Sequence, residues 1–341
     1  MTTISHNGKD VLVKIRDLSV TYHTRLGSLS AVDGVTFDVY KGEIMGLVGE
    51  SGCGKSTMGK ALMRMIAPPG EISGGRIIFD EAGDIMEYDD RQMRDFRGRR
   101  VSMIFQDPMT SLNPVQRVDE HIVEAIQVHE PKTAAEAALD RARTLIEKLG
   151  IRQNRLQDYP HQLSGGMRQR VMVGLGLVLN ADLIVADEAT TSLDVIVEAK
   201  LLDEFKKLRD EFNLTILLIT HNIALVAQLA DRIAVMYAGQ MAEIGDVTEV
   251  FDEPLHPYTD GLLRSVPNIK LDEREELYKM GGEPPNLTHP PSGCRFHPRC
   301  PKAMPICAER EPRLLSVNGD SGHLVHCWLY ETPPDDTKGV A

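Results

Sequence analysis

The sequence predicts an α/β fold of the phosphate-loop type, and three observations carry that prediction. A short apolar run at 44–48 leads into a glycine-rich loop and then into a stretch of helical character. Three further short apolar runs end at polar residues, as buried parallel strands do at the carboxyl edge of an open sheet. A second segment with paired glycines opens another apolar helix. Strand, glycine loop and helix in this order is the context expected of a phosphate-binding loop.

The glycine-rich loop at 49–57 fits the pattern G-x-x-x-x-G-K-[S/T] and precedes a predicted helix over 55–66. Its glycines allow backbone N–H groups to close around phosphate oxygens. The ammonium of Lys55 suits the β- and γ-phosphates, and the hydroxyl of Ser56 suits Mg²⁺. The predicted nucleotide-binding residues of this loop are Gly49, Glu50, Ser51, Gly52, Cys53, Gly54, Lys55, Ser56 and Thr57.

Three later apolar runs predict parallel strands at 101–105, 183–186 and 215–219. Ligands of open α/β sheets bind beyond the carboxyl ends of such strands. We therefore expect the polar residues that follow these strands to gather near the phosphate loop; they are Gln106, Asp187, Glu188 and His221.

The second glycine segment, 163–170, reads Leu-Ser-Gly-Gly-Met-Arg-Gln-Arg. Ser164 is a candidate N-cap for a helix over 167–179, and Gly165 and Gly166 leave bare backbone N–H groups at the positive helix end. The segment resembles the signature of ABC ATPases. The resemblance implies a P-loop NTPase of ABC type. Short runs that alternate apolar and polar residues, 11–15 and 35–39, predict an antiparallel β subdomain before the phosphate loop. Helical character over 120–149 and in the signature segment predicts a helical subdomain at about 107–180.

The same resemblance implies roles at the nucleotide. Asp187 would hold Mg²⁺ together with Ser56 and Gln106, Glu188 would orient the attacking water, and His221 would contact the γ-phosphate. Tyr22 either stacks on adenine or merely packs in its strand. Ala189 and Asn222 depart from the commonest family pattern, but neither stands where a residue touches phosphate or metal.

In ABC ATPases the signature residues reach the ATP of a partner subunit, so two domains close over two nucleotides. The run Ser192-Leu193-Asp194 matches the family's dimer-contact loop. One set of motifs is present, so the resemblance implies a second ATPase, either an identical copy or a paralogue that forms a heterodimer.

Four of the five cysteines follow a C-x5-C-x6-C-x19-C spacing near the C-terminus: Cys294, Cys300, Cys307 and Cys327. In a reducing compartment, clustered thiols indicate a metal more than disulfides. The spacing leaves an iron–sulfur cluster, zinc and free thiols open, and the Cys300-Pro301 pair favours the cluster.

Residues 106–114, 256–259 and 282–307 resemble the ATPase subunits of oligopeptide and dipeptide importers. The resemblance implies an ABC domain over 1–255 and a C-terminal domain over 256–341 whose four cysteines hold a [4Fe-4S] cluster, as in the D-type subunits. It also implies two transmembrane permease subunits and an extracytoplasmic substrate-binding protein. Peptide is the leading substrate, with nickel, glutathione and oligosaccharides as alternatives.

Composition limits the remaining classes. A formal net charge of −12 over 341 residues argues against nucleic-acid binding, which needs clustered Lys and Arg. No apolar stretch approaches the length of a membrane span, and the N-terminus lacks an export signal. We expect a peripheral protein on the cytoplasmic face of the cell membrane. The competing hypotheses are an ABC ATPase of DNA repair or translation and a nucleotide-gated redox sensor.

Overall fold

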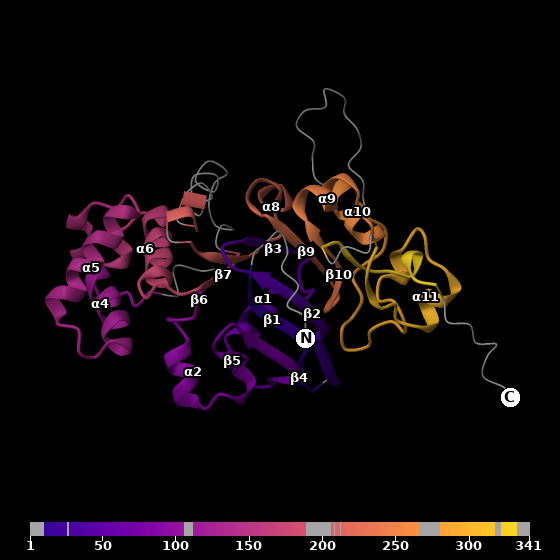
Figure 1. Ribbon diagram of the computed structural model, residues 1–341, viewed down its shortest axis with the longest axis horizontal. Helices are drawn as coiled ribbons and strands as arrows, with labels where there is room; N and C mark the ends of the chain where they lie inside the picture. Colours follow the sequence, from indigo (N-terminus) through magenta and orange to yellow (C-terminus); the bar gives the residue numbers. More distant parts are fainter. Residues whose placement is uncertain are drawn as a thin grey trace, which may run out of the picture. The chain divides into compact units, whose positions relative to one another are not determined.

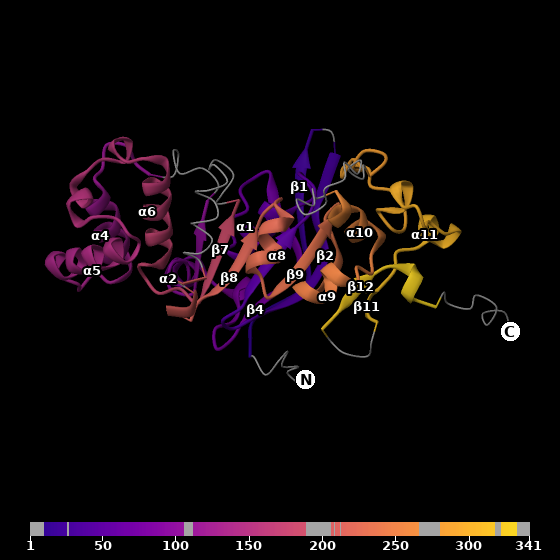
Figure 2. The same cartoon turned by 90° about the horizontal axis from the view of Figure 1, so that it is seen from above.

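The structure is a computed structural model that describes residues 10–25, 27–105, 112–188, 206–207, 209–211, 213–265, 280–317 and 322–332. The chain divides into two compact units, shown in Figures 1 and 2. The first unit joins Met1–Val39, Met45–Glu81 and Thr220–Ala341, and the second joins Tyr40–Ile44 and Ala82–Ile219.

The first unit holds two groups of strands and several short helices. Strands β1 and β4 pair antiparallel, with Val13 opposite Phe79, and β2 lies on the other side of β1. Strands β3 and β9 pair in parallel, whereas β10 runs antiparallel to β9 and to the C-terminal strand β12, which in turn pairs with β11. Its elements are β1 (Val11–Thr24), β2 (Gly27–Tyr40), β3 (Ile44–Val48), α1 (Lys55–Leu62), β4 (Gly70–Phe79), α8 (Ile223–Leu229), β9 (Arg232–Tyr237), β10 (Gln240–Asp246), α9 (Val247–Asp252), α10 (Pro257–Arg264), η4 (His297–Arg299), α11 (Pro305–Glu309), β11 (Leu314–Ser316), β12 (Leu324–His326) and η5 (Trp328–Tyr330).

The second unit contains a parallel sheet and a helical region. Strands β6, β7 and β8 pair in parallel through Ile104 with Ala186 and Asp187 with Ile219. Helices α4, α5 and α6 pack on one another, as both cartoon views show. Its elements are β5 (Gly83–Asp84), η1 (Ile85–Glu87), α2 (Asp90–Phe96), β6 (Val101–Ile104), α4 (Val118–His129), α5 (Ala135–Lys148), η2 (Gln153–Gln157), η3 (Pro160–Gln162), α6 (Gly165–Leu177), β7 (Leu183–Asp187) and β8 (Thr215–Ile219).

The predicted strands are confirmed. The runs at 44–48, 101–105, 183–186 and 215–219 form β3, β6, β7 and β8 with bounds that differ by at most a residue, and every residue of these four strands is buried. Full burial on both faces explains why these runs lack a polar alternation. The two strands expected before the phosphate loop, at 11–15 and 35–39, are longer than predicted: they form β1 and β2, each of 14 residues.

Two predicted helices differ from the structure. The helix expected over 55–66 ends at Leu62, because Arg64 adopts a left-handed backbone with φ 48° that a helix cannot continue through. The helical stretch expected over 120–149 divides into α4 and α5, since Pro131 lies between them and lacks the N–H that a helix interior needs.

A fully buried carboxylate joins the strands of the first unit to its C-terminal part. Glu243 on β10 accepts hydrogen bonds from the backbone N–H groups of Leu255 (2.8 Å) and His256 (2.9 Å). It also bonds the ring of His323 at 2.8 Å. A buried carboxylate is stable in the interior only when its oxygens have hydrogen-bond partners. The contacts to Leu255 and His256 fix the start of α10 against β10, and the contact to His323 fixes the residue that precedes β12.

Candidate nucleotide site

The phosphate loop is closely surrounded by backbone. A Cβ on Gly49 would lie 2.1 Å from the carbonyl oxygen of Met236, and one on Gly54 would lie 2.1 Å from that of Ala31. Both glycines have positive φ, 153° and 108°. Any side chain at either position would collide with main chain that belongs to β9 or β2, so the loop conformation itself requires glycine.

Lys55 lies at the centre of this loop and is 5% exposed. Its ammonium donates to the carbonyl oxygens of Gly49 (2.8 Å) and Glu50 (3.0 Å) and lies 3.7 Å from the sulfur of Cys53. Burial raises the pKa of the Cys53 thiol, against the opposing effect of Lys55. The ammonium is thereby placed inside the turn of the loop, where phosphate oxygens are expected.

Helix α1 begins at Lys55, directly after the left-handed Gly54. Ser56 and Thr57 therefore occupy its first turn, where backbone N–H groups and the positive end of the helix dipole face the loop. This part of the chain has the geometry of an anion site at a helix N-terminus.

His221 and Tyr22 are the other predicted site residues of the first unit. His221 is exposed and follows Thr220, whose N–H donates to the carbonyl of Leu47 at 3.2 Å, so it stands beside the end of β3 that enters the loop. Tyr22 is partly buried in β1, opposite Gly70. A Cβ on Gly70 would lie 2.5 Å from the Tyr22 ring, so the ring packs closely over its cross-strand neighbour. Its role at adenine stays a prediction.

In the second unit, Asp187 is the last residue of β7 and is 5% exposed. Glu188 follows with a left-handed φ of 47°, and its N–H donates to Ile219 at 2.9 Å. Such a backbone is uncommon for a residue with a side chain and occurs where the surroundings hold it in place. Gln106, like the contact loop 192–194, lies outside the described residues.

The signature segment forms a capped helix start, as predicted. The Ser164 hydroxyl accepts a hydrogen bond of 3.4 Å from the N–H of Met167, and α6 begins at Gly165, two residues before the predicted start. Ser164 and Gly165 are exposed, and a Cβ on Gly165 would meet no atom within 4 Å. Packing within the described residues therefore does not explain why position 165 is a glycine.

Comparisons with known proteins agree with these two motifs. A family model described as ABC transporter matches residues 32–191, and one described as oligopeptide/dipeptide transporter, C-terminal region, matches residues 242–307. The dipeptide transport ATP-binding protein DppD of Bacillus subtilis (strain 168) is 44% identical over 323 residues, which cover 94% of this chain and 95% of that protein. The chain belongs to the oligopeptide/dipeptide group of ABC transporter ATP-binding proteins. It is an ATP-binding subunit whose ATP hydrolysis is coupled to transport.

Other relatives and solved structures support the same assignment. The oligopeptide transport ATP-binding protein OppD of Escherichia coli (strain K12) is 43% identical over 304 residues, or 89% of each chain. A dimeric post-hydrolysis structure of the ATP-binding cassette MJ0796 with ADP and Pi aligns with a TM-score of 0.62 and 25% identity, covering 69% of this chain and 99% of that one. The structure of cbiO1 from Clostridium perfringens, part of the transporter complex cbiONQ, aligns with a TM-score of 0.62 and 26% identity over 72% and 92% of the two chains.

This ABC ATPase also has loop contacts that the sequence did not predict. The hydroxyl of Tyr258 accepts a hydrogen bond of 2.9 Å from the N–H of Glu50, and Arg299 forms two hydrogen bonds to the Glu50 carboxylate. Tyr258 belongs to the 256–259 run that resembled the importer ATPases, but no spacing in the sequence linked that run to the phosphate loop. A contact between residues 208 positions apart leaves no local pattern.

The four C-terminal cysteines are free thiols in the same region of the first unit. Burial, with a smaller contribution from the neighbouring thiols, raises the pKa of Cys294 to about 12 and that of Cys327 to about 11. Across the described ranges, no group of three or more His, Cys, Asp and Glu side chains is arranged to hold a metal ion. The structure therefore does not show the ligand set expected for the cluster, and the raised pKa values of Cys294 and Cys327 oppose the thiolate form that ligates metal.

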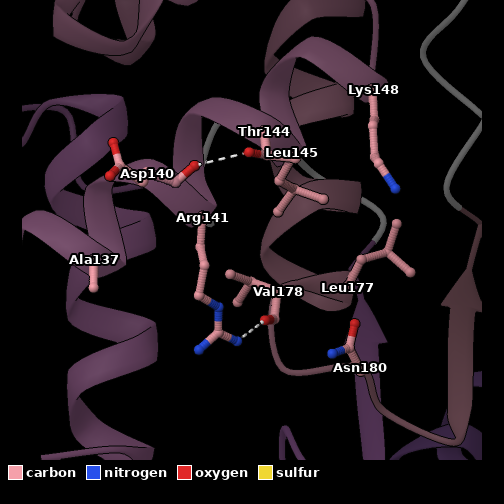
Figure 3. A pocket seen from close by; sticks show the side chains of 9 residues that line it. All are labelled: Ala137, Asp140, Arg141, Thr144, Leu145, Lys148, Leu177, Val178 and Asn180. Atoms are coloured by element: carbon pink, nitrogen blue, oxygen red, sulfur yellow. Dashed lines mark hydrogen bonds between the residues drawn. The ribbon is translucent and has the colours of Figure 1, made fainter. Parts of the chain in front are cut away.

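One cavity lies away from the nucleotide motifs, between α5 and the end of α6, with a volume of about 430 Å³ (Figure 3). Its charged side chains already have protein partners. Arg141 donates to Val178 (2.8 Å) and to Glu130 (2.7 Å), and Lys148 pairs with Glu211 at 2.6 Å. Because these charges are engaged, we assign the cavity no ligand. Among the residues described, no helix has the length and apolar character needed to cross a membrane.

Proposed function

We propose that this chain energises the import of peptides through an ABC transporter. The observation that carries the proposal is the 44% identity, over 94% of the chain, to a relative named as a dipeptide transport ATP-binding protein. The same group's C-terminal model matches residues 242–307, so the similarity extends beyond the nucleotide-binding motifs. Other solutes of this transporter group, namely nickel, glutathione and oligosaccharides, are the alternatives that a transport assay must exclude.

We propose the following roles in the transfer of the γ-phosphoryl group to water. The phosphate loop holds the β- and γ-phosphates through its N–H groups and Lys55. Ser56, Asp187 and Gln106 hold Mg²⁺, Glu188 orients the water, and His221 contacts the γ-phosphate. The buried ammonium of Lys55 and the constrained backbone of Glu188 support this division of roles. Tyr22 stacks on adenine in the same proposal.

The proposed assembly contains two permeases, an extracytoplasmic binding protein and a second ATPase that is a paralogue of this chain. Ser164, Gly165 and Gly166 would complete the nucleotide site of that second ATPase, and the exposure of the segment supports this role. The subunit would be peripheral, on the cytoplasmic face of the membrane. The domain boundary at 255 belongs to this proposal as well.

The function is tested with Glu188→Gln, which removes the base but keeps the size of the side chain. We expect ATP hydrolysis to fall by about 10²- to 10⁴-fold, the range of one general base, while ATP binding persists. Turnover is measured on the transporter purified from membranes. Glu211→Gln on the second unit is the matched control and should hydrolyse ATP normally; unchanged turnover in Glu188→Gln would remove Glu188 from its role.

The same variant identifies the partners. With Mg-ATP, Glu188→Gln should retain an ATP-bound complex that can be purified by affinity from detergent-solubilised native membranes. Mass spectrometry should find two permeases, a paralogous ATPase and a binding protein, with any peptide still bound. Repair or ribosomal proteins in their place would contradict the importer, and a complex without permeases would favour a nucleotide-gated sensor.

We also propose that Cys294, Cys300, Cys307 and Cys327 hold a [4Fe-4S] cluster, with zinc as the alternative. Support comes from backbone hydrogen bonds to the sulfurs. The N–H of Met304 donates to Cys307 at 3.4 Å, and backbone hydrogen bonds from Phe296, Lys302 and Leu329 lower the pKa of Cys294, Cys300 and Cys327 against the larger effect of burial. Such contacts favour thiolates.

When bound, the cluster would cross-link a loop-rich segment, and no step of ATP hydrolysis passes through it. Anaerobically prepared protein should contain about four iron and four acid-labile sulfide per chain. Zinc without iron or sulfide would replace the cluster with a zinc site, and protein free of both would leave structural thiols.

A further inference from the structure

The segment 294–300, which carries two of the cysteines, contacts the phosphate loop of the same unit through two arginines. Arg299 reaches Glu50, the second residue of the loop, across 249 positions of sequence. Arg295 reaches the turn between β9 and β10. The side chains of both arginines are buried: that of Arg295 is 8% exposed and that of Arg299 is 5% exposed.

The Arg299 guanidinium contacts Glu50, Gly281 and Tyr237. Its two terminal nitrogens donate to the two carboxylate oxygens of Glu50 at 2.8 and 2.9 Å, which is the bidentate geometry that gives arginine pairs their strength and direction. Its Nε donates to the carbonyl of Gly281 at 3.0 Å, and its guanidinium lies 5.7 Å from the centre of the Tyr237 ring. The hydrogen bond to Glu50 is also the main cause that raises the pKa of Arg299.

The backbone of Glu50 is fixed as well as its side chain. Tyr258, which is fully buried on α10, accepts the Glu50 N–H at 2.9 Å. The Tyr258 ring packs against Tyr237 and Phe296 with centroid distances of 4.5 and 5.5 Å. Phe296 lies in the same segment as Arg299. The cluster of Tyr237, Tyr258 and Phe296 therefore packs together the two parts of the chain that contact Glu50.

Arg295 supports the loop from its other side. It donates to the carbonyl of Ala238 and pairs with Asp33. The next residue, Gly239, donates its N–H to the carbonyl of Cys53 in the loop at 2.9 Å. The segment 294–300 therefore contacts the loop directly at Glu50 and supports it at Cys53 indirectly, through the turn that contains Ala238 and Gly239.

We propose that Arg299 is a positioning residue for ATP binding: it holds the Glu50 carboxylate away from the nucleotide phosphates and keeps the start of the phosphate loop in its binding conformation. Glu50 brings a negative charge into a loop that must accept a highly negative ligand. With Arg299 paired to it, that charge is neutralised and directed toward the C-terminal part. Without Arg299, the carboxylate is free to rotate toward the phosphates and repel them, and the loop loses one of its anchors.

The inference rests on ATP binding by the phosphate loop, and it makes an affinity prediction that a purely structural contact does not. The Kd for ATP is measured by titration calorimetry on the full-length chain for the wild type, Arg299→Met, Glu50→Gln and the double variant. Arg299→Met should weaken ATP binding by about tenfold, which corresponds to about 1.4 kcal/mol. Adding Glu50→Gln to that variant should restore the Kd to within about threefold of the wild type, because the repelling charge is then gone.

The controls separate charge from folding. Arg313→Met breaks another arginine–glutamate pair of the C-terminal part, with Glu331 at 2.5 Å, and should leave the Kd for ATP unchanged. Arg299→Lys keeps the charge and the stem but loses the two-pronged contact, so it should weaken binding by about threefold and serves if Arg299→Met fails to fold. The defect of Arg299→Met should also shrink at high salt, since it is caused by an exposed charge.

Two results would overturn the inference: an unchanged Kd in Arg299→Met and Arg299→Lys, or a double variant as weak as Arg299→Met. The second result would mean that Arg299 holds the fold and not the loop charge. Failure of the wild type itself to bind ATP would instead refute the nucleotide function, so the two failures are distinguishable.

Discussion

The phosphate loop and the signature segment both depend on glycines, yet their surroundings are opposite. Around the loop, backbone oxygens of Met236 and Ala31 leave no space for a side chain on Gly49 or Gly54. At the signature segment, the position of a Cβ on Gly165 is open, with no atom within 4 Å. The loop glycines are therefore required by this chain's own fold, whereas Gly165 is not.

This difference separates two kinds of functional glycine. A glycine packed by its own chain is needed before any ligand binds, so its replacement should damage folding and binding together. A glycine with open space around its Cβ position and no positive φ, such as Gly165, is not required by the packing or backbone of the described residues. In the proposed assembly it is required by the nucleotide of the second ATPase. Replacing it should damage activity in the assembly and nothing in the isolated subunit.

The largest effect is expected for Gly54→Ala. The new methyl group would collide with the Ala31 carbonyl and would also sit at a φ of 108°, so the loop must move. We expect ATP binding to be lost and the protein to be destabilised by about 3 kcal/mol or more. Calorimetric ATP titration and thermal unfolding measure the two effects.

The matched control for this change is Gly34→Ala, which has a positive φ of 61° but open space around its Cβ. It should bear only the backbone strain, about 1 kcal/mol, and bind ATP normally. Normal ATP binding by Gly54→Ala would contradict the view that packing requires the loop glycines.

A smaller effect, confined to the assembled transporter, is expected for Gly165→Ala. The isolated subunit should melt at the wild-type temperature and bind ATP with the wild-type Kd, because the methyl group touches no atom of the residues that the structure describes. In the purified transporter, ATP hydrolysis should fall by about tenfold or more, since a backbone N–H site that faces a phosphate tolerates little added bulk. Full activity in the transporter would show that Gly165 does not face a nucleotide, and a lower melting temperature would show that it has a packing role.

The last effect is absent at neutral pH and appears only in acid; it concerns His256, which supports the phosphate loop through Tyr258. Burial lowers the pKa of His256 to about 3, with a smaller contribution from His326, while His256 accepts the N–H of Tyr258 at 3.0 Å. The unfolded chain takes up the His256 proton near pH 6.5 and the folded chain near 3, so the unfolded state binds more protons between these values. The stability that the neutral ring contributes is thus complete above pH 6.5 and is lost as the pH falls toward 3.

We therefore expect His256→Asn, which keeps an acceptor for the Tyr258 N–H, to flatten the dependence of unfolding free energy on pH. The slope between pH 6.5 and 4 should decrease by up to about 1.4 kcal/mol per pH unit, the value for one proton. Denaturant unfolding at several pH values measures it. His289→Asn, at an exposed position, is the control and should keep the wild-type slope; an unchanged slope in His256→Asn would mean that the folded and unfolded states bind the His256 proton equally well, and would contradict the lowered pKa.

Local patterns predicted much of the fold and of the nucleotide motifs. The runs that form β3, β6, β7 and β8 were recognisable because strands buried on both faces are apolar throughout, and Ser164 was recognisable as a helix cap because capping uses the residues next to it in sequence. The phosphate loop was recognisable for the same reason: its glycines, Lys55 and the helix after them are contiguous. The end of α1 at Leu62 could not be predicted from the sequence, because the left-handed residue that follows the helix is Arg64 and not the glycine or asparagine that usually marks such a position.

The sequence by itself determined that this chain is an ABC ATPase with two glycine motifs, because each motif is a contiguous run of residues that can be recognised without the rest of the chain. Only the tertiary structure decided what surrounds those motifs. The pairing of Glu50 with Arg299, the N–H contact to Tyr258 and the closed packing of Gly54 against Ala31 join positions far apart in sequence. These contacts form only when the strands and helices pack together, so no local pattern in the sequence predicts them.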